Sequence, residues 1–182
     1  MSLQEMFDAL VARGPNSLLA EHAGALASLI GSWTVEVFDA EGDGAKRVSD
    51  GEWHFGWVLE GRAIQDVLIV PERQHRTADL PAKGNRYATS LRMFDPAAAI
   101  WRVISVDPVG NICLSMTSRE ADREIISEGE ILAGNRVRFT LFDLTHDAFR
   151  AREERLSDGE WQVTTELRAH RKKWPGAGQT QS

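Results

Sequence analysis

Apolar side chains recur every three or four residues along the first part of the chain, which is the spacing of one face of a helix. This stripe consists of Leu3, Met6, Phe7, Leu10 and Val11. The segment Gly14–Ser17 ends it and supplies a serine as the N-cap of a second helical stretch that runs to about Ile30. We therefore predict an N-terminal helical segment at residues 1–30. We interpret its stripe as packing on the protein's own body rather than as a surface for a partner.

From Trp33 onward the apolar residues alternate with polar ones, the period of a strand with one face in a core. Beyond Asp95 turn-forming residues recur about every dozen positions, which is typical of long strands joined by hairpins. A meander of about eight to ten antiparallel strands hides its edges only by closing. We predict a mainly β fold, an up-and-down barrel over residues 31–173. The strand faces that support it are Trp53, Phe55 and Trp57; Ile112, Leu114 and Met116; Phe139, Leu141 and Asp143; and Trp161, Val163, Thr165 and Leu167.

Two segments depart from this rhythm. Residues 71–86 contain two prolines, a glycine and few apolar side chains, and they connect two predicted strands. Connections of this length inside a domain are mouth loops, lids or mobile segments, so a lid and a plain mobile loop are both open interpretations. Residues 174–182 are predicted to be a flexible tail.

The composition is that of an ordinary globular domain of 182 residues, with 42% hydrophobic and 26% charged side chains and a net charge of −6. This acidic balance argues against a dedicated nucleic-acid-binding protein, which needs clustered Lys and Arg. The lone Cys113 cannot form a disulfide within the chain, and the N-terminal residues do not resemble a secretory signal. No segment approaches the roughly 20 apolar residues of a membrane span. We expect a cytoplasmic protein.

Gly31 and Trp33 form a Gly-x-Trp pattern at the entry of the first predicted strand. This pattern resembles the signature of the calycin superfamily, which includes lipocalins and fatty-acid-binding proteins. The resemblance implies that Trp33 plugs the closed end of a barrel and that an arginine of the last strand covers it. Arg168 is the best-placed arginine for this role. The chain departs from lipocalins because its helices precede the strands.

The wider layout is similar to a group of bacterial domains related to the calycins. The similarity spans about residues 20–172 and includes the motifs Gly51-x-Trp53, Leu59-x-Gly61-Arg62, Arg92-x-Phe94-Asp95-Pro96 and Phe142–Asp143. It implies a barrel and brings no established substrate.

A barrel of this size has room for one small ligand. Arg102 alternates with Ile100 and Ile104, so it either reaches into a pocket or lies on an apolar outer face. The aromatic candidates line a pocket or simply fill the barrel as core. Buried charges are more informative, because an unpaired one costs several kcal/mol. The candidate ligand-binding residues are Trp53, Phe55, Trp57, Arg92, Trp101, Arg102, Phe142 and Arg152.

Arg152 shares a strand face with Arg150 and Glu154. Pointing inward, this face would anchor a carboxylate or hydroxyl headgroup. Pointing outward, it would form an exposed ladder of ion pairs. We favour the outward orientation, because the apolar positions from Trp161 to Leu167 occupy the opposite face of the neighbouring strand.

An enzyme built on this fold would need a titratable group inside the barrel. The weak candidates are His54, Asp66 and Glu166. No pair of the five histidines has the spacing of a zinc site, so we expect no metal. Haem-binding relatives in the calycin superfamily use a late-strand histidine, which only His170 matches here. Their glycine-rich motif is absent, so we expect no cofactor.

Three functions are open from the sequence. We favour binding of a small, largely apolar molecule inside the barrel. One alternative is a cofactor-independent isomerase, cyclase or lyase that acts on such a substrate. The other is a non-catalytic module in which the helices and an exposed apolar barrel face form a homodimer. The orientation of the strand faces, and whether the barrel is hollow, separate these functions.

Overall fold

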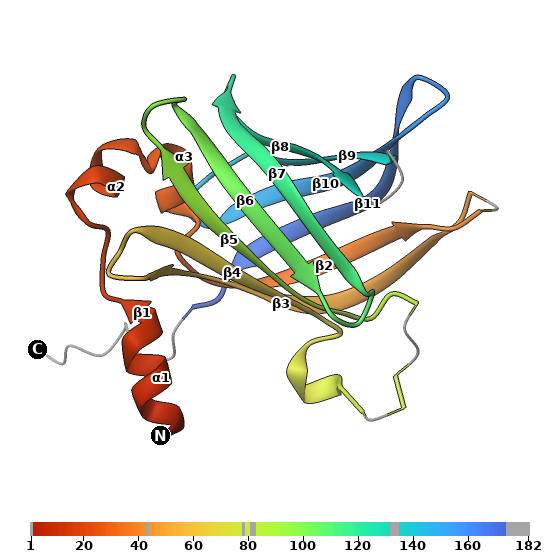
Figure 1. Cartoon of the computed structure of the whole chain (residues 1–182). Coiled ribbons are helices and arrows are strands. Elements are labelled where there is room, and N and C mark those ends of the chain that lie inside the picture. Colours follow the sequence, from red (N-terminus) through yellow and green to blue (C-terminus); the bar gives the residue numbers. More distant parts are fainter. Residues whose placement is uncertain (1, 43, 78, 81–82, 132–134, 174–182) are drawn as a thin grey trace, which may run out of the picture.

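The computed structural model describes residues 2–42, 44–77, 79–80, 83–131 and 135–173. In this part of the chain ten antiparallel strands, β2 to β11, form one closed barrel that short helices precede (Figure 1). The mainly β barrel predicted from the alternating pattern is confirmed. The predicted tail at residues 174–182 lies outside the described residues. None of the described helices is long and apolar enough to cross a membrane.

Each strand pairs with its neighbours in sequence, and β11 pairs with β2 to close the barrel. Closure leaves no strand of the barrel with an unpaired edge. A two-residue strand, β1 (Val11–Ala12), adds to the end of β3. The barrel strands are β2 (Gly31–Ala40), β3 (Lys46–Val58), β4 (Ala63–Val70), β5 (Arg86–Asp95), β6 (Ile100–Asp107), β7 (Ile112–Ala121), β8 (Glu124–Ile131), β9 (Asn135–Phe142), β10 (Ala148–Ser157) and β11 (Glu160–Arg171).

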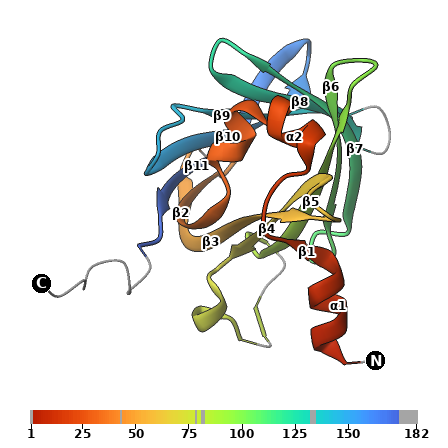
Figure 2. The same cartoon turned by 90° about the vertical axis from the view of Figure 1, so that its left-hand side faces the viewer.

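Two short helices, α2 (Ser17–His22) and α3 (Gly24–Ser28), cover one end of the barrel (Figures 1 and 2). Asn16 caps α2, because its side chain accepts a hydrogen bond from the backbone N–H of Leu19 at 2.9 Å. Leu19 and Leu26 are almost fully buried in the barrel core. This apolar cover closes that end.

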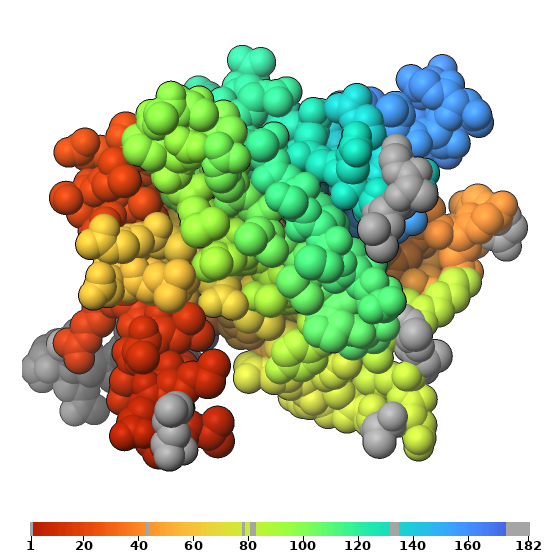
Figure 3. Space-filling model, in the orientation of Figure 1, coloured from red at the N-terminus to blue at the C-terminus, as the bar shows by residue number. Residues whose placement is uncertain are grey.

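The first helix, α1 (Leu3–Leu10), stands away from the barrel (Figure 3). None of its residues is buried, and Leu3 is 89% and Phe7 58% exposed. The prediction that all of residues 1–30 packs on the barrel is therefore wrong for α1. Its apolar residues do have helical spacing, but spacing alone does not determine what the stripe faces.

Trp33 fills the closed end of the barrel. Its side chain is fully buried, and its Nε1 donates a hydrogen bond to the carbonyl oxygen of Leu29 at 2.8 Å. Arg171 lies over the ring, 4.1 Å from its centroid, and donates to two backbone carbonyls just before β2. The prediction that Arg168 covers Trp33 is wrong. Arg168 lies over Phe38, because the even-numbered positions in this part of β11 face outward.

The opposite end of the barrel is open and carries the hairpins β2–β3, β6–β7, β8–β9 and β10–β11 (Figure 1). The long β4–β5 connection, which contains η1 (Arg73–His75), lies at this end as well. Arg76 holds this connection against the ends of β4 and β5, because its side chain donates hydrogen bonds to the backbone carbonyls of Val70 and Arg86 at 3.0 and 3.2 Å. The connection thus borders the mouth of the barrel, and its action as a lid stays a prediction.

A bulge in β11 reverses the two faces of that strand. Glu153 of β10 lies opposite Thr165, but Glu154 lies opposite Val163, so Thr164 is an extra residue. Thr165 is 5% exposed, whereas Val163 is 46% exposed. The prediction that alternate positions from Trp161 to Leu167 share one face is therefore wrong. Simple alternation takes no account of an inserted residue.

Candidate functional site

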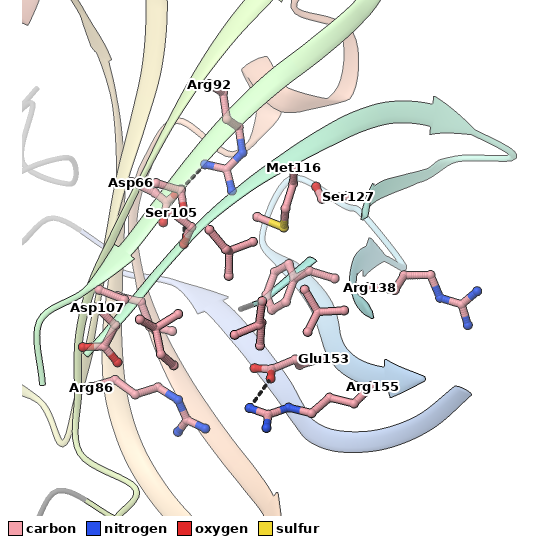
Figure 4. A pocket seen from close by; sticks show the side chains of 18 of the residues that line it. Asp66, Arg86, Arg92, Ser105, Asp107, Met116, Ser127, Arg138, Glu153 and Arg155 are labelled. Atoms are coloured by element: carbon pink, nitrogen blue, oxygen red, sulfur yellow. Dashed lines mark hydrogen bonds and ion pairs between the residues drawn. The ribbon is translucent and has the colours of Figure 1, made fainter. Parts of the chain in front are cut away.

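The open half of the barrel contains a cavity of about 140 Å³ whose wall is formed by strands β3 to β10 (Figure 4). The closed half is packed with buried apolar side chains. There Trp33 and Trp53 each pack against Phe149. The ring centroid of Phe149 lies 4.7 Å from that of Trp33 and 5.5 Å from that of Trp53. The barrel is therefore filled at the end under the helices and hollow toward the mouth.

A buried ion pair between Asp66 of β4 and Arg92 of β5 lies at the inner end of the cavity. Their side chains are 3% and 4% exposed, and Nη1 of Arg92 donates to Oδ2 of Asp66. The other carboxylate oxygen, Oδ1, accepts a hydrogen bond from Nε1 of Trp53 at 2.8 Å. Both oxygens of Asp66 are thus engaged.

Arg92 is only partly satisfied by this pair. Among the described residues its buried Nε has no hydrogen-bond partner. Its second terminal nitrogen points toward the middle of the cavity (Figure 4). A buried donor without an acceptor costs about 1–3 kcal/mol. Arg92 therefore presents one terminal nitrogen as a donor to the cavity, while its Nε is enclosed and unpaired among the described residues.

Two serines extend this polar surface. Ser90 lies opposite Asp66 on one side and opposite Ser105 on the other. The Oγ of Ser90 donates to the Oγ of Ser105 at 3.1 Å, which leaves the hydroxyl proton of Ser105 free to donate. We call Asp66, Ser90, Arg92 and Ser105 the polar patch; it belongs to β4, β5 and β6.

The wall formed by β7, β8 and β9 is mostly apolar. Leu114, Met116, Val137 and Phe139 line it, together with the small polar side chain of Ser127. We call these four apolar residues the apolar wall. The cavity thus has a polar side and an apolar side.

Charged side chains of both signs surround the mouth of the cavity. Asp39 binds Arg86 at 2.5 Å and Arg47 at 2.7 Å. Burial acts to raise the pKa of Asp39, but the interactions with Arg86 and Arg47 outweigh it and hold the pKa below its ordinary value. Glu153 lies 3.4 Å from Arg155, and both line the cavity, as does Asp107. The charges at the mouth are thus largely paired.

The predicted ligand-binding residues divide into three groups. Trp53 and Arg92 line the cavity, beside the candidate acid Asp66. A second group points into the barrel but packs as core in the closed half. This group consists of Phe55, Trp57 and Trp101, which are 5%, 9% and 6% exposed.

The third group, Arg102, Phe142 and Arg152, lies on the outer face of the barrel. Arg102 pairs with Asp95 at 2.6 Å and is 59% exposed, and Arg152 lies 5.2 Å from the centroid of Phe142. Arg152 therefore has the outward orientation that we favour from the sequence. For Arg102 and Phe142 the predicted lining role is wrong, because the buried Trp101 takes the inward position next to Arg102.

Glu166 and His170 occupy outward positions of β11. Glu166 pairs with Lys46, whose hydrogen bond lowers the pKa of Glu166. His170 is exposed beside a surface depression, so its imidazole does not reach a group bound in the cavity. In the part of the chain that the structure describes, no cluster of three or more His, Cys, Asp and Glu side chains is placed to hold a metal.

His54 also lies on the outer face, within a polar cluster. Its Nδ1 is 2.9 Å from Oγ of Ser32, and its Nε2 is 3.0 Å from Oε2 of Glu52. The contacts from Ser32 through His54 to Glu52 resemble the catalytic triad of a hydrolase. However, Glu52 also accepts hydrogen bonds from Arg73 and Lys172. The Arg73 hydrogen bond is the main reason that the pKa of Glu52 lies far below its ordinary value. We interpret the cluster as an ion network that ties β3 to the segments after β4 and β11.

Several cavity residues were not among the predicted site residues. Ser90 was detectable, because it shares a strand face with Arg92. Ser105 and Glu153 carried no separate signal. Arg86 fell in the segment predicted to be a loop, whereas the structure begins β5 at this residue.

The chain matches no protein-family model and no curated protein. Among solved structures it is similar to the crystal structure of Rv2717c from M. tuberculosis, with a TM-score of 0.57 and 15% sequence identity. The match covers 87% of this chain and 99% of that one. A likeness at this identity shows the fold alone.

Proposed function

We propose that this protein binds a small, largely apolar organic molecule in the open half of its barrel. The observation that carries the proposal is the cavity itself. Protein interiors are close-packed, with few voids larger than a water molecule, and a hollow of about 140 Å³ exceeds an ordinary packing defect. The cavity also has one polar and one apolar side. An amphipathic ligand is complementary to both sides, whereas water is complementary to the polar side alone.

The two sides contribute in different ways. The apolar wall supplies hydrophobic burial, worth roughly 25 cal/mol for each Å² of apolar ligand surface removed from water. The polar patch adds a few directed hydrogen bonds, which fix orientation rather than supply most of the affinity. The mouth opens between hairpins, so a ligand has a route that leaves the core under α2 and α3 intact.

Titration with N-phenyl-1-naphthylamine, whose fluorescence rises in apolar surroundings, tests this proposal. We expect saturable binding of one probe per chain. Ala88→Phe places a ring in the cavity, since Ala88 lines it, and should abolish binding. Ile104→Phe adds a ring at an outer position that is 44% exposed, and should leave binding unchanged. Absence of saturable binding to the folded wild-type protein, or equal binding by both variants, contradicts the proposal.

A further inference from the structure

We propose that the cavity selects an uncharged ligand with a carbonyl-type acceptor oxygen, which Arg92 and Ser105 recognise. This inference rests on the ligand binding proposed above and specifies the chemistry of that same site. It concerns the polar patch, where a buried ion pair and two serines meet at the inner end of the cavity.

The hydrogen-bonding inventory of the polar patch favours an acceptor on the ligand. Both oxygens of Asp66 already accept hydrogen bonds, from Trp53 and Arg92. The second terminal nitrogen of Arg92 points toward the middle of the cavity, and the Ser105 hydroxyl retains its proton. The patch therefore has donors to offer and few acceptors. A ligand oxygen that accepts from these groups removes the cost of unmet buried donors.

The charge balance of the patch favours an uncharged acceptor. The positive charge of Arg92 is already compensated by Asp66, which directly contacts it. A carboxylate ligand would have to give up its hydration and lie close to the Asp66 carboxylate, with no uncompensated cation nearby to offset this. The mouth adds no excess positive charge, because Arg86 and Arg155 are themselves paired. A ketone, amide or ester oxygen avoids this penalty.

The two sides of the cavity also specify the orientation of the ligand. Its acceptor oxygen faces β5 and β6, where Arg92 and Ser105 lie, and its apolar body lies against Leu114, Met116 and Phe139. A molecule with one polar end and a compact hydrocarbon or aromatic body satisfies both sides at once.

Three nearly isosteric probes separate these contributions: ethylbenzene, acetophenone and benzoate. They share one ring and differ in carrying no acceptor, a neutral acceptor, or a charged acceptor. Dissociation constants are measured from amide chemical-shift changes at neutral pH. We expect acetophenone to bind about tenfold more tightly than ethylbenzene, the effect of satisfying one buried donor. We expect benzoate to bind more weakly than acetophenone.

Four variants connect the preference to the named residues. Arg92→Lys keeps a cation beside Asp66 but removes the planar donor edge, and should reduce the preference for acetophenone over ethylbenzene to about threefold or less. Ser105→Ala should reduce it in the same direction, whereas Ser127→Ala, the same kind of change in the opposite wall, should not alter it. Asp66→Asn leaves Arg92 uncompensated, and benzoate should then become the tightest probe.

Two results would overturn this inference while leaving ligand binding intact. One is equal affinity of the wild-type protein for acetophenone and ethylbenzene. The other is benzoate as its tightest probe. If none of the three probes binds, and N-phenyl-1-naphthylamine also fails to bind, the proposed function itself is wrong.

Discussion

Replacing Arg92 by Met should destabilise the protein far more than the same replacement at Arg102. Both arginines pair with an aspartate, which makes them a matched comparison. The Arg92–Asp66 pair is buried, with side chains 4% and 3% exposed, whereas Arg102 is 59% exposed beside Asp95. Within the part of the chain that the structure describes, Arg92→Met leaves the Asp66 carboxylate with the Trp53 N–H as its one remaining partner.

The expected magnitude follows from this burial. Removing one partner of a buried ion pair costs about 3–5 kcal/mol, because the remaining charge stays uncompensated. For a chain of 182 residues, 1 kcal/mol changes Tm by about 2–4 °C, so Tm should fall by about 6–20 °C. The double variant Asp66→Asn with Arg92→Met should recover most of this loss, since no buried charge remains and Asn still accepts from Trp53.

The assay is urea unfolding followed by tryptophan fluorescence, which yields the free energy of unfolding of each variant. Arg102→Met should unfold within experimental error of the wild type. The reasoning is refuted if Arg92→Met and Arg102→Met have the same unfolding midpoint. It is refuted as well if the double variant is no more stable than Arg92→Met.

Three further predictions concern other parts of the fold. Deletion of residues 2–9 should change Tm by less than about 2 °C in calorimetry, because α1 buries no side chain; a large loss would mean that α1 packs on the barrel. Arg171→Met should cost about 2 kcal/mol in urea unfolding, since Arg171 donates to backbone carbonyls before β2, while Arg168→Met should cost much less; equal costs would contradict the cover over the plug. The pKa of Glu52 is lowered in the folded state from its ordinary value of 4.5. The stabilisation by its charged carboxylate is therefore present above pH 4.5 and is lost as the pH falls through the pKa of the folded state. Glu52→Gln should therefore be less stable than the wild type at neutral pH, and the difference should shrink in acid; a difference independent of pH would contradict this.

The barrel was predictable because its signals are local. Period-two alternation and turn residues every dozen positions require only that each strand pairs with the next, and a closed meander satisfies them all. The face that points inward is not local information. The predicted lining role of Arg102 and Phe142 is wrong, because these side chains face outward. The bulge at Thr164 exchanges the inward and outward faces of β11. Arg171 rather than Arg168 covers Trp33, because the odd-numbered positions in the last part of β11 face inward.

The candidate site was harder to predict because the cavity lies where side chains are small. The predicted lining was built from large aromatic residues, and Phe55, Trp57 and Trp101 fill the closed half as core. The hollow half has Ala88 and several serines at its inward positions. A cavity requires missing volume, so small residues at inward strand positions are the better signal. Arg92 was found because a charge within an alternating strand needs a partner, which Asp66 provides.

The most direct test of ligand binding in the cavity is an NMR measurement of intermolecular NOEs between acetophenone and the protein's methyl groups. The cavity account requires NOEs from the probe to Leu114, Met116 and Val137. It requires these NOEs to disappear in Ala88→Phe. NOEs to the exposed α1 residues Leu3 and Met6, with none to the apolar wall, would show that small apolar molecules bind the outer surface and would contradict the account.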